Sequence, residues 1–218
     1  MRQARPEMKR SGRKRERTCG ELVAAAERLV AVHGLDAISI DDITEAAHVA
    51  KGTFYTHFED KDDLAAVIGT RIRFELEDRV TRVNEGVTDT AQRMANGLST
   101  ALAFAIANPV RARALLRLRP SAVDPDASIN AGIRSDIALG LKANRFWAAS
   151  LTAAVVATIG TAMSAMLRVT GSRHGLTDPH AFAADVIATA LVALGLKPNE
   201  ATRLAAAAMT ARKKEPVP

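Results

Sequence analysis

Residues 40–64 constrain the fold of this chain more than any other stretch. Their apolar side chains recur at helical spacing in three short bursts, and a reversal at residues 48–50 separates the first two. The bursts are Ile40, Ile43 and Ala47, then Phe54 and Phe58, and then Leu64, which Val67 continues. Two short helices joined by so tight a turn predict a helix-turn-helix, with a third helix directly after it.

The composition favours an all-α fold. Aromatic residues make up only 4% of the 218 residues, alanine is abundant, and alternating strand-like patterns are scarce. We predict an N-terminal three-helix domain that contains the helix-turn-helix, followed by a C-terminal helical domain. The single cysteine, Cys19, excludes an internal disulfide and suits a reducing compartment. Because no apolar leader segment follows Met1, we expect a cytoplasmic location.

The positive charge of the chain lies at its N-terminus. Residues 1–17 hold eight basic and two acidic side chains, a net charge of +6 that equals the charge of the whole chain. The other 201 residues balance, with 22 basic and 22 acidic side chains. These first 17 residues lack apolar periodicity and contain Pro6 and Gly12, so we predict a disordered basic arm. A solvated tail without a partner is the alternative to a DNA-binding arm, whose candidate contacts are Arg13, Lys14, Arg15 and Arg17.

Helix-capping patterns divide the chain further. Residues 18–21 (TCGE) and 39–42 (SIDD) are typical of capping boxes that begin the first and second helices. Residues 60–63 (DKDD) begin a helix predicted over 61–83, and Gly34 is predicted to end the first helix. We therefore predict a helix-turn-helix domain over 18–62, a second helical domain over 63–212 and a disordered tail over 213–218.

Two apolar helices in the second half predict a dimer. Residues 146–167 carry no charge, but many Ala, Ser and Thr residues make them a weak candidate for a membrane span. We predict instead a helix buried on nearly all sides. A helix near 181–195 is apolar on two faces, and large exposed apolar patches are rare on monomers, so both helices are expected to pair with a second copy. The predicted dimerisation residues are Leu151, Val155, Ile159, Met166, Phe182, Val186, Thr189 and Ala193.

The run VAKGTFYTHFEDKDDL at residues 49–64, preceded by IDDITEAA, resembles the TetR family of bacterial transcription regulators. The resemblance is specific from residue 18 to about residue 64, and further along the chain it extends only to the architecture. It implies a dimer of nine- or ten-helix chains whose N-terminal domains bind an operator in double-stranded DNA. It also implies a small-molecule pocket in the C-terminal domain over 63–212, where we place the dimer interface as well. We expect no cofactor and no membrane partner.

The residues around the predicted second helix of the motif divide into an inner and an outer set. Phe54 and Phe58 are four residues apart and are predicted to face the core, while Gly52 allows close approach to a DNA groove. His48 and Ala50 depart from the family pattern, since Gly is common at the first position and a Ser or Thr cap at the second. The resemblance places phosphate contacts at Ser39, Tyr55, His57 and Lys61, and base-edge contacts at Lys51, Gly52, Thr53 and Thr56. The alternative is a three-helix packing unit without a DNA role.

The pocket is less constrained by the sequence. Large side chains at helical spacing either line a pocket or fill the core, and a few polar residues could anchor a ligand. The predicted ligand-binding residues are Phe74, Met94, Leu98, Phe104, Arg113, Asn130, Arg134 and Trp147.

No sequence motif indicates an enzyme, since neither a P-loop, a dinucleotide fingerprint, a zinc-protease motif nor a nucleophile elbow occurs. The loop residues His174, Asp178 and His180 are interpreted as solvated rather than metal-binding, and Cys19 as a bystander thiol. We predict a repressor that an apolar small molecule releases from a palindromic operator. The alternatives are a constitutive architectural DNA-binding protein without an inducer and, from another class, a helical enzyme or carrier.

Overall fold

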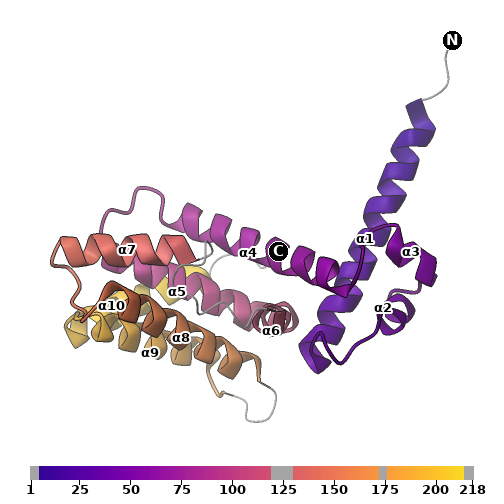
Figure 1. Cartoon of the computed structure of the whole chain (residues 1–218). Coiled ribbons are helices and arrows are strands. Elements are labelled where there is room, and N and C mark those ends of the chain that lie inside the picture. Colours follow the sequence, from indigo (N-terminus) through magenta and orange to yellow (C-terminus); the bar gives the residue numbers. More distant parts are fainter. Residues whose placement is uncertain (1–4, 119–129, 172–175, 214–218) are drawn as a thin grey trace.

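The computed structural model describes residues 5–118, 130–171 and 176–213, and these residues form helices and connecting loops without any strand (Figure 1). The all-α prediction is therefore confirmed. The helices, in chain order, are α1 (Arg5–His33), α2 (Ile40–Ala46), α3 (Lys51–Tyr55), α4 (Lys61–Val83), α5 (Thr90–Ala107), α6 (Pro109–Leu118), α7 (Ala131–Lys142), α8 (Leu151–Thr170), α9 (Pro179–Ala193) and α10 (Pro198–Lys213).

The first three helices form a small packed unit, and α2 begins at its predicted cap. The hydroxyl of Ser39 accepts a hydrogen bond from the backbone N–H of Asp42, and the Asp42 carboxylate accepts one from the backbone N–H of Ser39, so the predicted capping box at α2 is confirmed. His48 adopts a φ of 55° in the turn before α3, the left-handed conformation that its position in the turn requires. Phe54 and Phe58 lie in the core, as predicted.

The N-terminal arm is not separate from the first helix, and here the prediction was wrong. α1 begins at Arg5 and runs without a break through residues 18–21, which were predicted to start it. Arg, Lys, Glu and Met are good helix formers, Pro6 falls in the first turn where its missing N–H costs nothing, and Gly12 is tolerated inside a long helix. Figure 1 shows the N-terminal half of α1 projecting away from the rest of the molecule.

The C-terminal helices pack around α5, which contacts α4, α6, α7, α8, α9 and α10. Its buried side chains include Met94, Leu98, Leu102 and Phe104. α4 spans both parts of the molecule, beginning beside α1 and ending against α5 (Figure 1). Because α4 is one continuous helix, a movement at its C-terminal end can be transmitted to the unit that carries α3.

Arg145 ties three parts of the C-terminal helices together. From the loop between α7 and α8, its guanidinium donates to Asp89, the N-cap of α5, at 2.8 and 3.1 Å, and to Glu200 on α10 at 2.7 Å. These hydrogen bonds lower the pKa of both carboxyl groups. The stability they contribute is therefore present near neutral pH and is lost as the pH falls through those lowered values.

The two apolar helices α8 and α9 are less buried within one chain than predicted. Only 33% of the most apolar window of α8 is buried, although α8 is the one described helix long and apolar enough to cross a membrane. Its buried face holds Val155, Ile159 and Met166, so these three predicted dimerisation residues pack inside their own chain instead. An α-helix turns by 100° per residue, and the opposite face is the exposed one. Exposed residues of α8 on that face are Ala153, Val156, Ala157, Ser164, Leu167 and Arg168.

The other predicted dimerisation residues lie toward the surface. On α9, Phe182 and Val186 are half-buried while Thr189 and Ala193 are exposed, and Leu151 at the start of α8 is half-buried. α9 packs its opposite face, with Ala183, Ile187 and Ala190, into the chain. Residues 214–218 of the predicted tail lie outside the described residues, and Lys213 ends α10.

Candidate nucleic-acid interface and ligand site

The exposed face of α3 carries most of the predicted base contacts. Lys51, Gly52, Tyr55 and Thr56 are exposed and Thr53 is half-buried. A methyl group built at Gly52 would meet no atom within 4 Å, so the backbone here is open to an approaching surface. The helix is held from behind by the buried Phe54, whose ring lies 5.6 Å from that of Phe58 and 5.5 Å edge-on from Tyr55. Ala50 precedes the helix and makes no side-chain cap hydrogen bond.

Lys51 is not a free cation. Its ammonium lies 2.8 Å from Oδ1 of Asp41 on α2 and donates to Oδ2 at 3.0 Å. This hydrogen bond and the charge of Asp41 raise the pKa of Lys51. Both side chains are exposed, so a phosphate or base edge can replace Asp41 at small cost.

The ammonium of Lys61 makes two hydrogen bonds to the backbone, which argues against its predicted phosphate contact. Its ammonium donates to the backbone carbonyls of Leu35 at 3.2 Å and Ile38 at 2.6 Å, both in the loop between α1 and α2. Through these two hydrogen bonds Lys61 holds the loop against the start of α4. Ser39 remains exposed, but its hydroxyl already bonds Asp42.

One basic residue of α1 reaches the C-terminal end of α3. Nη2 of Arg15 donates to the backbone carbonyl of Thr56 at 3.2 Å, and the Thr56 hydroxyl donates to the carbonyl of Thr53 at 2.7 Å. Burial and the charge of Arg15 lower the pKa of the neighbouring His57, which favours the neutral imidazole. Arg15 lies four residues before Cys19 and seven before Leu22. In the sequence, only this helical spacing indicates that Arg15 lies on the same face of α1 as these two residues.

Three further basic residues of the predicted arm lie on the surface of α1. Arg13, Lys14 and Arg17 are exposed, and Nε of Arg17 lies 3.4 Å from the carboxylate of Glu21. An exposed pair of this kind is weak and leaves Arg17 available to another anion.

The predicted pocket residues separate into two groups. Met94, Leu98, Phe104 and Asn130 are buried, and Arg113 and Arg134 are half-buried. Phe74 and Trp147 were assigned wrongly, because each is 72% exposed. Phe74 lies two residues beyond Ile72 and therefore outside the buried face of α4. Trp147 lies in the loop before α8. Of the loop cluster considered for a metal, His174 lies outside the described residues.

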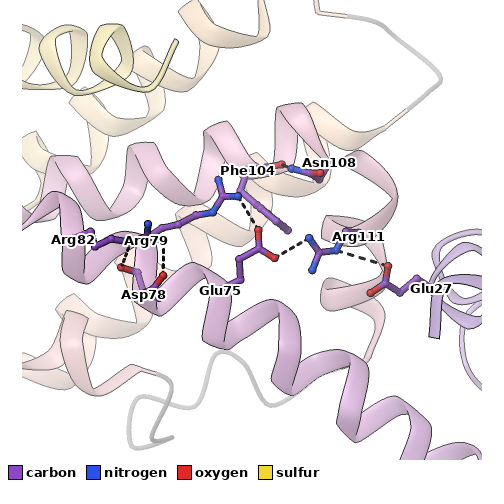
Figure 2. A network of polar contacts seen from close by, with 8 residues as sticks. All are labelled: Glu27, Glu75, Asp78, Arg79, Arg82, Phe104, Asn108 and Arg111. Atoms are coloured by element: carbon purple, nitrogen blue, oxygen red, sulfur yellow. Dashed lines mark hydrogen bonds and ion pairs between the residues drawn. The ribbon is translucent and has the colours of Figure 1, made fainter. Parts of the chain in front are cut away.

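A charged network at the junction of the two domains was not found from the sequence. Arg111 of α6 places Nη1 2.8 Å from Oε2 of Glu75 on α4 and Nε 3.7 Å from Oε2 of Glu27 on α1, as Figure 2 shows. Arg79 continues the network, since its Nη2 donates to Oε1 of Glu75 at 2.8 Å. The guanidinium carbon of Arg111 lies 5.5 Å from the ring centre of Phe104, a cation–π distance.

This network lines a hollow of about 320 Å³ between α1, α4 and α6. Glu27, Glu75, Arg111 and Arg71 all contribute to its wall. Burial raises the pKa of Glu27, while the charge of Arg111 opposes that effect. Long-range pairs of this kind have no local sequence signal, because Glu27 and Arg111 are far apart in the chain.

The helix-turn-helix region is similar to known proteins in sequence. Residues 22–68 match the family described as bacterial regulatory proteins, tetR family. Fifty residues are 42% identical to an uncharacterised HTH-type transcriptional regulator, YwcC, of Bacillus subtilis (strain 168), a match that spans 23% of this chain and 22% of that protein.

Solved structures share the fold along most of the chain. A tetR-family regulatory protein from Rhodococcus RHA1 has a TM-score of 0.68 at 21% identity, covering 83% of this chain and 98% of the other. A gamma-butyrolactone receptor (ArpA-like protein) gives 0.67 at 19%, covering 90% and 99%. RolR in complex with resorcinol gives 0.54 at 23%, covering 95% and 98%.

A helix-turn-helix domain is followed by a helical C-terminal domain, and tetR-family structures share this architecture. The family match over residues 22–68 assigns the N-terminal domain to the tetR family of bacterial regulatory proteins, and the whole chain shares the fold of tetR-family structures. The resemblance noted in the sequence is confirmed, and the fold is that of tetR-family transcription regulators.

Proposed function

We propose that this regulator is a homodimeric repressor that binds a palindromic operator and is released by an apolar small molecule. The observation that carries the proposal is the exposed polar face of α3 around Gly52, held rigidly by Phe54 and joined through continuous α4 to a second helical domain. A constitutive architectural DNA-binding protein would need the first feature but not a responsive second domain.

The DNA contacts are assigned by chemistry. Tyr55 is exposed at the end of α3, where its hydroxyl can donate to a phosphate, and its ring already packs edge-on against Phe54. Thr53, Thr56 and Lys51 offer hydroxyl and ammonium groups to base edges, with Gly52 between them. Lys61 is left out of this set, because the α1–α2 loop already occupies its ammonium.

Tyr55→Phe should weaken binding to all duplexes by roughly tenfold, because a hydrogen bond to a charged phosphate is lost while the ring packing stays. Thr53→Val, of similar shape, should instead change which base pairs are preferred in duplexes selected from a random pool. Fluorescence anisotropy on selected and random duplexes measures both effects. If Tyr55→Phe changed only the sequence preference, the phosphate assignment would be wrong.

The dimer is proposed through the outward faces of α8 and α9. These faces expose Val156 and Leu167 on α8 and Val192 on α9, with 40%, 55% and 40% of each side chain accessible. The two helices pack side by side, so their outward faces form one largely apolar surface, which also carries the exposed charged residues Arg168 and Asp185. A two-fold axis through this surface would form a four-helix bundle and set the spacing of the two α3 helices.

The ligand is proposed to enter the C-terminal domain among Met94, Leu98 and Phe104. RolR has been crystallised with resorcinol, and another relative is a gamma-butyrolactone receptor, so small, largely uncharged molecules fit structures of this kind. Phe104 contacts Arg111, which in turn reaches Glu27 on α1. A ligand that moves Phe104 would therefore disturb a contact between the two domains.

A thermal-shift screen of uncharged compounds, including small phenols and lactones, should find one that raises the melting temperature by about 5–10 °C at 100 times its Kd. The same compound should release DNA in an anisotropy titration. Arg111→Met should keep the thermal shift but weaken the release, because the link to Glu27 is cut. Compounds that bind and leave DNA affinity unchanged would favour the architectural alternative.

A further inference from the structure

The basic N-terminal half of α1 is part of a rigid helix that passes the recognition helix. Residues 5–17 carry seven basic and two acidic side chains, and they extend α1 by roughly 20 Å at 1.5 Å per residue. Figure 1 shows this part of α1 standing free beyond α3, on the side away from the C-terminal helices. Arg13, Lys14 and Arg17 are exposed along it.

The extension is held to α3 by a specific contact. Arg15 lies on the same face of α1 as the buried Leu22, and its guanidinium donates to the carbonyl of Thr56, the C-cap of α3. This hydrogen bond fixes the direction of the extension relative to the face that carries Tyr55. A cation that bonds a carbonyl at the end of a helix is also favoured by the helix dipole.

The rest of the DNA-binding unit cannot supply the positive charge that DNA requires. Residues 18–63 hold ten acidic and three basic side chains, a net charge of −7. Of those three, Lys51 is paired with Asp41 and Lys61 donates to two carbonyl groups. An acidic unit is repelled by phosphates at long range, so the attraction must come from elsewhere on the DNA-facing side.

We propose that the basic half of α1 binds the phosphate backbone of DNA beside the half-site as a rigid helix, kept in register with α3 by Arg15. The proposal rests on the proposed DNA-binding function and adds a second, sequence-independent contact element to it. A flexible arm of the same charge would also be attracted, but its affinity would not depend on helix continuity or on Arg15.

Gly12 allows these two cases to be separated without changing charge. A methyl group at Gly12 would meet no atom within 4 Å, so Gly12→Ala fits and strengthens the helix, whereas Gly12→Pro interrupts it. We expect Gly12→Ala to tighten binding two- to fivefold and Gly12→Pro to weaken it about tenfold. The probe is a random-sequence 40-base-pair duplex, and circular dichroism reports the helix content of each variant.

Arg15→Lys provides a second test with its own control. Lysine keeps the charge but loses the planar guanidinium that reaches Thr56, so affinity should fall several-fold. Arg28→Lys, at an exposed position of the same helix outside the basic half, should leave the affinity unchanged. Equal affinities for both Gly12 variants and the unchanged protein, with helix contents that differ, would overturn the inference. Failure of the unchanged protein to bind any duplex would overturn the proposed function and this inference with it.

Discussion

Leu167→Glu should convert the proposed dimer into a folded monomer and weaken binding to a palindromic duplex at least a hundredfold. Leu167 is 55% exposed on the outward face of α8, so within one chain a carboxylate there would remain in water. In the dimer the same carboxylate would be buried in an apolar surface, close to its symmetry mate. A monomer reaches only one half-site, so it loses the affinity gained when the second subunit binds the second half-site on the same duplex. A hundredfold loss of affinity corresponds to about 2.7 kcal/mol.

Sedimentation velocity and a melting curve check this prediction together. Val155→Glu is the matched control, since Val155 is fully buried on the inward face of the same helix and a charge there should unfold the chain rather than split the dimer. If Leu167→Glu remained a dimer with unchanged DNA affinity, the outward face of α8 would not be the interface.

Removing residues 2–17 should lower DNA affinity at least tenfold at moderate salt and flatten its dependence on salt. Each neutralised phosphate contributes about −0.9 to the slope of log affinity against log salt. With about two to three contacts per subunit, the slope for the dimer should fall by roughly 4–5. Residues 18–21 can cap the shortened helix, so the truncated protein should still fold.

The salt titration is read against a control of unchanged charge. The Gly12→Ala variant keeps all eight basic residues of the segment and should retain the full slope. A truncated protein with the same slope and affinity as the full chain would show that residues 1–17 take no part in DNA binding.

Local patterns predicted the N-terminal unit and α4 well. The capping residues Ser39 and Asp60 begin α2 and α4 as expected, and α4 spans the predicted residues 61–83. A cap is a local interaction between residues three apart, so the sequence carries it directly. The start of α1 was missed because a capping pattern does not prevent a helix from running through it when the preceding residues are good helix formers.

Contacts between distant residues could not be predicted in the same way. The occupation of Lys61 by two carbonyls, the bond from Arg15 to Thr56 and the bridge from Arg111 to Glu27 all join residues far apart in the chain. The faces of α8 were also assigned wrongly, because a helix that is apolar all round has no polar stripe to show which side meets its own chain.

The most direct test of the account is selection of binding sites from a random duplex pool by the full-length protein, followed by affinity measurement on the enriched sequences. Two identical α3 faces related by a two-fold axis must read two identical half-sites. We therefore expect an enriched palindrome whose affinity falls at least a hundredfold when one half-site is scrambled. Enrichment of an asymmetric sequence, or of none, would contradict it.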